Sequence, residues 1–175
     1  MVEYIIGIDP GPTESAFVLM SALDCKPVFF RKEKNVLMWA NVMLACETVG
    51  WDKVDFAVEM VASYGMPVGR EVFDTCVWIG QMKEQIEMHD HKCNYIYRRE
   101  EKLAICHSPR ANDASIHVAL IDRFAGGVPN KGKGTKKEPG WFYGFRADIW
   151  QAYAVAVTYH DKLKERSGHV CEHPY

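Results

Sequence analysis

The sequence predicts an α/β domain whose mixed five-stranded sheet is flanked by helices. The first strand candidates follow one another as a meander, which is antiparallel, and the later ones are separated by helical patterns, which return the chain in a parallel sense. With 175 residues, of which 48% are hydrophobic and 25% charged, the chain has a globular composition and is long enough to bury one core. We therefore expect a single domain over residues 1–175.

The first half of the chain begins with a strand. Residues 2–9 are apolar and β-branched and end in Asp-Pro-Gly, which is typical of a strand followed by a turn. The fourth strand candidate runs into Glu59 and then into a loop that contains Gly and Pro. The elements predicted after the first strand are strands 15–21 and 27–32, helix 35–47, strand 55–60 and helix 71–89.

The second half begins with a fifth strand candidate at residues 93–97, followed by short helical patterns at 100–106 and 113–124. Residues 126–140 are rich in Gly, Pro and Lys and cannot bury enough apolar surface to order themselves, so they predict a flexible cationic loop. The last element, residues 148–164, has apolar positions on one helical stripe.

Composition excludes several classes of protein. The first residues contain neither a basic region nor a small-residue cleavage site, and no apolar run approaches the ~20 residues that a membrane span needs. The six cysteines show no CxxC spacing, which favours reduced thiols over a disulfide framework. We expect a cytoplasmic protein with no membrane partner.

The net charge of −2 hides an asymmetry between the two halves. Residues 1–90 carry 7 basic and 14 acidic side chains, a net charge of −7, whereas residues 91–175 carry 14 and 9, a net charge of +5. A basic half can face a polyanion, although uneven charge is also common on ordinary solvated surfaces.

Three carboxylates occupy similar places in the predicted fold. Asp9 ends the first strand, Glu59 ends the fourth, and Asp148 begins the last helix. Ends of strands are where sites gather in α/β sheets, and a shared divalent cation would offset the cost of burying carboxylates in apolar runs. Oxygen ligands without a matching His or Cys set favour Mg²⁺ or Mn²⁺. Taken singly, each residue is also explained as a turn residue or a helix cap.

Several segments in order resemble the RuvC-like family of Holliday junction resolvases, especially its shorter phage and prophage relatives. They are GIDPG at 7–11, AVEM at 57–60 followed by SYGMPVGR, REEKLAICHSPRANDASIHVALIDRF at 99–124 and KGTKKEPGWFYGFRADIWQAYAVAVTYHD at 133–161. The resemblance covers most of the chain. It implies an RNase H-like fold, a homodimer, a bacterial or phage-infected host cell, and metal-dependent paired nicking of branched DNA in recombination and repair.

Carried over residue by residue, the resemblance makes Asp9, Glu59 and Asp148 metal ligands. The family commonly has a fourth acidic or histidine ligand spaced three residues from the last one on the same helix. Here that position is Gln151, whose amide can coordinate Mg²⁺ but has no charge; if Asp148 is instead the later ligand of the pair, Phe145 stands at the earlier position and cannot coordinate.

The implied chemistry is hydrolysis with two Mg²⁺ or Mn²⁺ ions per active site, which needs converging acids and no covalent nucleophile. Asp9 would bridge both ions, and Lys102 matches a basic residue near the scissile phosphate. Where the family often has another lysine this chain has Asn112, for which Arg110 is a possible substitute. The other expected DNA contacts come from the loop after Glu59 and from the cationic loop at residues 126–140, called the lysine loop below. They are Tyr64, Arg70, Lys131, Lys133, Lys136 and Lys137.

Two aromatic features have ordinary structural explanations as well. Phe73 could stack on an unpaired base, but core packing is the favoured interpretation. The cluster around Phe142, Phe145 and Trp150 could stack on DNA, but anchoring of the lysine loop is favoured.

Two other functions stay open. A branched-DNA-binding protein with weakened catalysis is compatible with Gln151. An actin-like ATPase would also begin with GIDPG, but it needs a second Gly-rich phosphate loop and roughly twice this length, so it is disfavoured.

Overall fold

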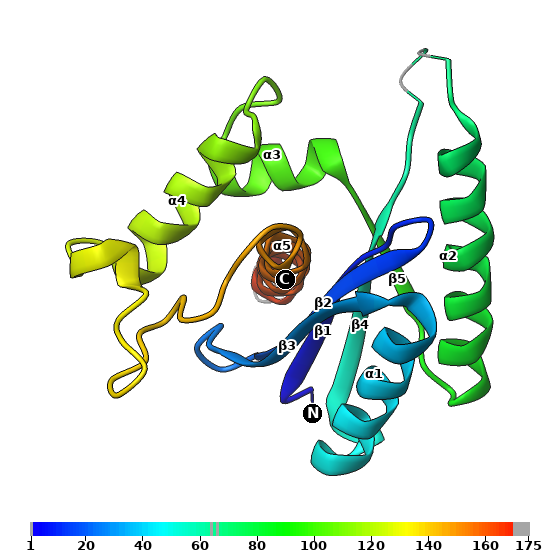
Figure 1. The fold of residues 1–175 in the computed structure, drawn as a ribbon, viewed down its shortest axis with the longest axis horizontal. Coiled ribbons are helices and arrows are strands. Elements are labelled where there is room, and N and C mark those ends of the chain that lie inside the picture. Colours follow the sequence, from blue (N-terminus) through cyan, green and yellow to red (C-terminus); the bar gives the residue numbers. More distant parts are fainter. Residues whose placement is uncertain (1, 64, 66, 170–175) are drawn as a thin grey trace, which may run out of the picture.

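A computed structural model describes residues 2–63, 65 and 67–169. Its centre is a five-stranded sheet with the order β3-β2-β1-β4-β5 (Figure 1). The strands are β1 (Tyr4–Asp9), β2 (Glu14–Ser21), β3 (Pro27–Lys34), β4 (Val54–Met60) and β5 (Cys93–Tyr97). β2 pairs antiparallel with β1 and β3, whereas β4 pairs parallel with β1 and β5. The predicted fold class is confirmed.

Helices cover both faces of this sheet (Figure 1). The helices are α1 (Asn35–Val49), α2 (Arg70–Met88), α3 (Arg98–Cys106), α4 (Asp113–Ala125) and α5 (Ile149–His169), with short 3₁₀ turns at Trp51–Lys53 and Pro129–Gly132. Side chains alternate along β1, so that Ile5 joins the apolar cluster under α5 and α4 while Ile6 joins the cluster under α1 and α2. The sheet therefore separates two hydrophobic cores.

Gly7 lets α5 approach the sheet unusually closely. A Cβ atom built on Gly7 would lie 2.2 Å from the carbonyl oxygen of Ala152 and 2.8 Å from Cβ of Ala156. Only glycine fits at this contact between β1 and α5. The contact lies two residues before Asp9 and four residues after Asp148, so it also sets the distance between these two carboxylates.

The lysine-rich segment before α5 forms a small hairpin on a backbone-paired stem. Gly134 and Pro139 form a β-bridge. Gly140 N–H donates to the carbonyl of Lys133 at 3.0 Å, and Phe142 N–H donates to the carbonyl of Gly132 at 3.0 Å. Flexibility of residues 126–140 stays a prediction.

Aromatic side chains attach this hairpin to the core, as the sequence favours. Phe142, Phe145 and Trp150 are buried and pack edge-on or tilted against one another. Phe73 differs from its expected role: it is 60% exposed on α2, because the face of α2 that meets the sheet is formed by Ile79, Met82 and Ile86. In the described part of the chain, no helix has the length and apolar character needed to cross a bilayer.

Candidate metal centre and nucleic-acid interface

Asp9 and Glu59 lie side by side at the carboxyl ends of the neighbouring strands β1 and β4. β1 and β4 are parallel neighbours in which Ile8 pairs with Val58, so the next residue of each strand lies at the same level. The two side chains are partly buried and share a hydrogen bond. The sequence-based expectation that these acids converge agrees with this geometry.

The two carboxyl groups behave as a pair that shares a proton. Burial, reinforced by the charges of Glu59 and Asp148, raises the pKa of Asp9 to about 8, while Arg98 opposes the rise. Burial also raises the pKa of Glu59, although Arg98 and the hydrogen bond from Asp9 act in the opposite direction. The pair therefore holds a proton more tightly than isolated carboxyl groups do, because burial and mutual repulsion disfavour two negative charges at this place.

Asp148 approaches this pair from the turn that precedes α5. Its carbonyl accepts from Ala152 N–H at 2.9 Å, which begins the helix. Its carboxylate, which is 43% exposed, forms a 2.6 Å ion pair with Nζ of Lys32 on β3. The charge of Asp148 still reaches Asp9 and raises its pKa.

Glu101 on α3 is a fourth acid at the site, and the sequence analysis did not single it out. Its side chain is fully buried and accepts from Nη1 of Arg98 at 2.6 Å. Burial and the charges of Glu59 and Asp9 raise the pKa of Glu101 well above its usual range. The only sequence signal was its place three residues after Arg98, a spacing that usually marks an exposed helical ion pair.

Gln151 reaches the site through Glu101. Its Nε2 atom donates to Glu101 at 3.4 Å. The remaining oxygens of both residues, Oε1 of Glu101 and Oε1 of Gln151, are buried and have no hydrogen-bond partner among the residues that the structure describes. Buried oxygens without donors are costly, and a cation would satisfy them.

The side chains do not yet form a closed metal site. Among residues 2–63, 65 and 67–169, no three His, Cys, Asp or Glu side chains are arranged to hold a metal ion together. The positive charge that a metal ion would supply comes from two ion pairs: Lys32 pairs with Asp148, and Arg98 pairs with Glu101. The donor set of hard oxygens and the unpaired buried atoms fit Mg²⁺ or Mn²⁺, with rearrangement of these two ion pairs.

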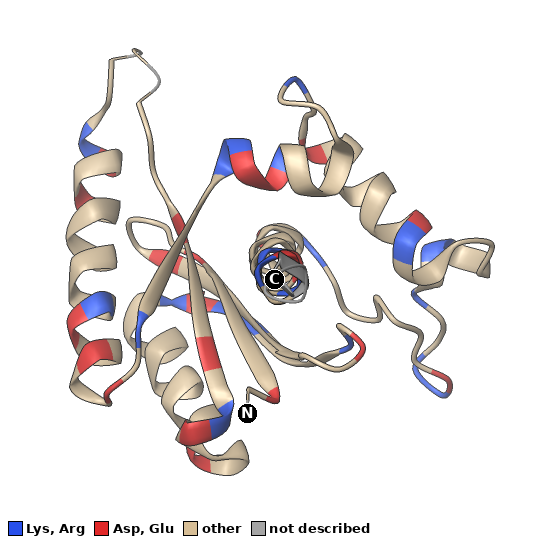
Figure 2. Cartoon of the chain, turned by 180° about the vertical axis from the view of Figure 1, so that it is seen from behind, with Lys and Arg blue, Asp and Glu red and all other residues tan. Residues whose placement is uncertain are grey.

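Two hollows with basic residues in their linings each include the ion-pair partner of one of the acids, Arg98 for Glu101 and Lys32 for Asp148. Lys102 lines one of about 380 Å³ together with Arg98 and Arg99. Figure 2 shows that acidic and basic residues alternate in these first turns of α3.

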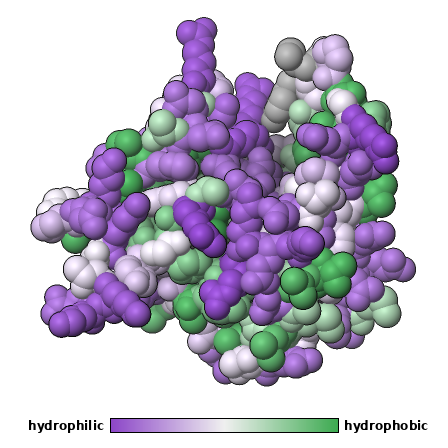
Figure 3. All heavy atoms as spheres, viewed as in Figure 1, coloured by the Kyte–Doolittle hydropathy of each residue, from purple (hydrophilic) through white to green (hydrophobic). Residues whose placement is uncertain are grey.

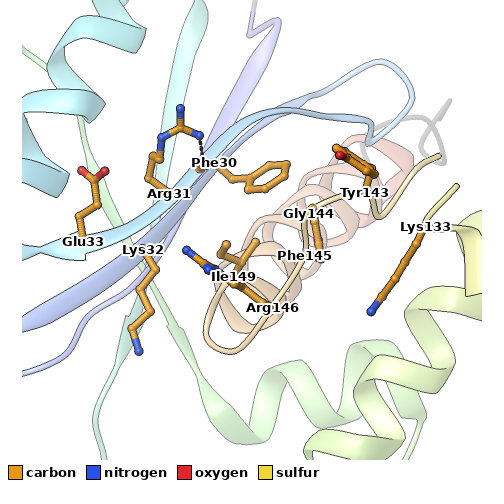
Figure 4. Close-up of a pocket in the computed structure, with 10 residues that line it drawn as sticks. All are labelled: Phe30, Arg31, Lys32, Glu33, Lys133, Tyr143, Gly144, Phe145, Arg146 and Ile149. Atoms are coloured by element: carbon orange, nitrogen blue, oxygen red, sulfur yellow. Dashed lines mark hydrogen bonds between the residues drawn. The ribbon is translucent and has the colours of Figure 1, made fainter. Parts of the chain in front are cut away.

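The second hollow, of about 780 Å³, lies between β3 and the turn before α5. Figure 4 shows Lys32, Arg146 and Lys133 directed to the same side of β3, and Arg31 directed to the opposite side. Lys32 and Arg146 were not singled out in the sequence: Lys32 stands in a mixed-charge run, RKEK, and Arg146 is an isolated basic residue.

The remaining expected DNA contacts are dispersed. Arg110 is exposed in the turn before α4, and Arg70 is exposed at the start of α2, where it pairs with Asp74 at 3.5 Å. Lys131, Lys136 and Lys137 are exposed on the lysine hairpin. Tyr64 lies outside the described residues. The DNA-binding role of each of these residues stays a prediction.

Comparison with solved structures decides the fold. Thermus thermophilus RuvC matches with a TM-score of 0.68 at 16% sequence identity, over 94% of this chain and 96% of that one. The chain has the RuvC fold. Thermus thermophilus RuvC in complex with a Holliday junction substrate matches with a TM-score of 0.67 at 14% identity, over 93% and 95% of the two chains. Neither the scan against protein-family models nor the search of curated proteins gives a match. The resemblance to RuvC seen in the sequence motifs is thus confirmed for the fold.

Proposed function

We propose that this protein is a Mg²⁺- or Mn²⁺-dependent endonuclease that nicks branched DNA, in particular four-way junctions. One observation supports this most: the acids Asp9, Glu59, Asp148 and Glu101 gather at one edge of a sheet with the RuvC fold. RuvC has been solved in complex with a Holliday junction substrate, which favours the same class of DNA here.

The acids would hold the metal, and the basic residues would hold the phosphates. Asp9, Glu59, Asp148 and the Gln151 amide are the proposed ligands for two ions. When bound, divalent ions supply Lewis-acid activation of water and of the leaving oxygen. Lys102 and Arg110 on one side, and Lys32 and the lysine hairpin on the other, would position the backbone of the DNA across the acids.

Paired nicking needs two active sites, so the proposal includes a homodimer. Exposed apolar side chains on α2 support a protein contact there: Phe73 and Val77 are exposed by 60% and 61%. Figure 3 shows hydrophobic side chains reaching the surface on the side of the molecule where α1 and α2 lie. Action in the cytoplasm remains part of the same proposal.

A labelled four-way junction incubated with the protein, with either Mg²⁺ or EDTA, tests the function. We expect nicks with 5′ phosphates in Mg²⁺ and none in EDTA, because the acids act only through the cation. Asp148→Asn should lower cleavage by at least 100-fold and leave junction binding largely intact, since Asp148 is partly exposed and outside the core. Unchanged cleavage, with folding verified by circular dichroism, would refute the role of Asp148.

The same assay addresses the alternative suggested by Gln151. Binding of the junction without cleavage in Mg²⁺ or Mn²⁺ would identify a branched-DNA-binding protein that has lost nuclease activity. Failure to bind and to cut would refute both functions.

A further inference from the structure

The acid at position 101 stands where the metal site lacks a charge. If Asp148 is the earlier ligand of the pair on the last helix, the later position, three residues further, holds the neutral Gln151. The structure brings a carboxylate from a different element, α3, into hydrogen-bond contact with that same glutamine. The missing negative charge is thereby restored next to its expected place.

Glu101 is not explained by its contacts within the protein. A fully buried carboxylate needs donors for both oxygens. Arg98 and Gln151 both donate to Oε2, and within the described part of the chain Oε1 has no partner. Arg98 is moreover shared with Asp113. An ion pair alone would not require Glu101 to be buried beside Asp9 and Glu59, whose negative charges oppose its own.

Gln151 provides a second observation. Its amide nitrogen faces the carboxylate of Glu101, because the reverse orientation would place two acceptor oxygens against each other. Its own Oε1 atom is consequently turned elsewhere, and it is also buried with no donor from residues 2–63, 65 and 67–169. One hydrogen-bonded pair thus carries two unpaired oxygens at the edge of the acid site.

We propose that Glu101 is the additional acidic metal ligand of this protein, and that Gln151 orients it and contributes an amide oxygen. The proposal rests on the function proposed above and specifies its ligand set. The second cation would be held between α3 and α5 rather than by two acids on α5. Glu101 then supplies the charge that Gln151 lacks.

Mn²⁺ binding to the metal-free, full-length protein tests this, measured by isothermal titration calorimetry and by the rise in melting temperature. Glu101→Gln should weaken Mn²⁺ binding at least 10-fold in a protein that keeps wild-type helicity, because the ligand loses its charge while Arg98 retains Asp113 as a partner. The matched control is Glu100→Gln, since Glu100 pairs with Lys162 at 2.6 Å and accepts from Tyr97 N–H, a contact that an amide oxygen retains. It should bind Mn²⁺ as the wild type does.

A double variant separates a ligand from a structural residue. Glu101→Gln with Gln151→Glu exchanges the carboxylate and the amide, and it keeps both the pair and the net charge. We expect it to recover most of the lost Mn²⁺ affinity. Recovery of none, in a protein with wild-type helicity, would overturn the assignment.

The outcomes distinguish this proposal from the function on which it rests. If Asp9→Asn weakens Mn²⁺ binding and Glu101→Gln does not, the role of Glu101 is refuted and the nuclease proposal stands. If the wild type binds no Mn²⁺ at all, both are refuted.

Discussion

The close contact between β1 and α5 predicts that Gly7→Ala is strongly destabilising. The new Cβ would lie 2.2 Å from the Ala152 carbonyl oxygen and 2.8 Å from Ala156 N, so the collision involves backbone atoms that rotamer changes cannot relieve. Overpacking in a core costs about 1–3 kcal/mol, and a contact this short belongs at the upper end. With about 2–4 °C per kcal/mol for a chain of this size, the melting temperature should fall by about 6–12 °C.

Thermal and urea denaturation of Gly7→Ala, with Gly80→Ala as the control, checks this. Gly80 lies within α2 and a Cβ there meets nothing within 4 Å, so the same substitution should stabilise the protein by about 0.5–1 kcal/mol. Because relief of the collision also displaces α5 and Asp148, junction cleavage by Gly7→Ala should fall at temperatures where the variant is folded. A loss of stability below about 1 kcal/mol would refute the reasoning.

Two further predictions concern charge. The raised pKa of Asp9, about 8 against an ordinary value of 3.8, means that the folded state binds more protons than the unfolded state between these values. The metal-free protein should thus lose stability as pH rises from about 4 to 8, and Asp9→Asn should flatten this dependence in urea denaturation; stability that rises over this range would contradict the assignment. Lys32→Ala should change the free energy of unfolding by less than about 1 kcal/mol, because its ion pair with Asp148 is partly exposed. It should nevertheless weaken junction binding, measured by fluorescence anisotropy, and lower the slope of log affinity against log salt concentration by about 1. An unchanged salt slope would exclude a phosphate contact.

Local patterns were sufficient to predict the sheet and the convergence of Asp9 and Glu59. A β-branched run ended by Asp-Pro-Gly is typical of a strand followed by a turn. Neighbouring parallel strands bring their carboxyl ends together whatever surrounds them. The anchoring aromatic residues were also predicted, since a cluster of large rings in one segment needs a core.

Glu101 and Lys32 could not be found in this way. Glu101 stands in a polar run, REEK, that indicates an exposed helix; only the packing of α3 against α5 buries it. Lys32 lies on an edge strand. It belongs to the site only through its ion pair with Asp148, a residue 116 positions further along the chain. Phe73 was expected in the core and is exposed. An aromatic residue in a helical pattern does not reveal which face of the helix meets the sheet.

The stem of the lysine hairpin is joined through main-chain atoms: the bridge of Gly134 with Pro139, and the donations from Gly140 and Phe142 to carbonyl oxygens. Side chains at the tip, including Lys136 and Lys137, project from this frame without supporting it. Positive charges can consequently be added or removed there one residue at a time without loss of the main-chain pairing. Under the proposed function, substitutions at the tip would change the salt dependence of DNA binding and leave the fold of the domain unaltered.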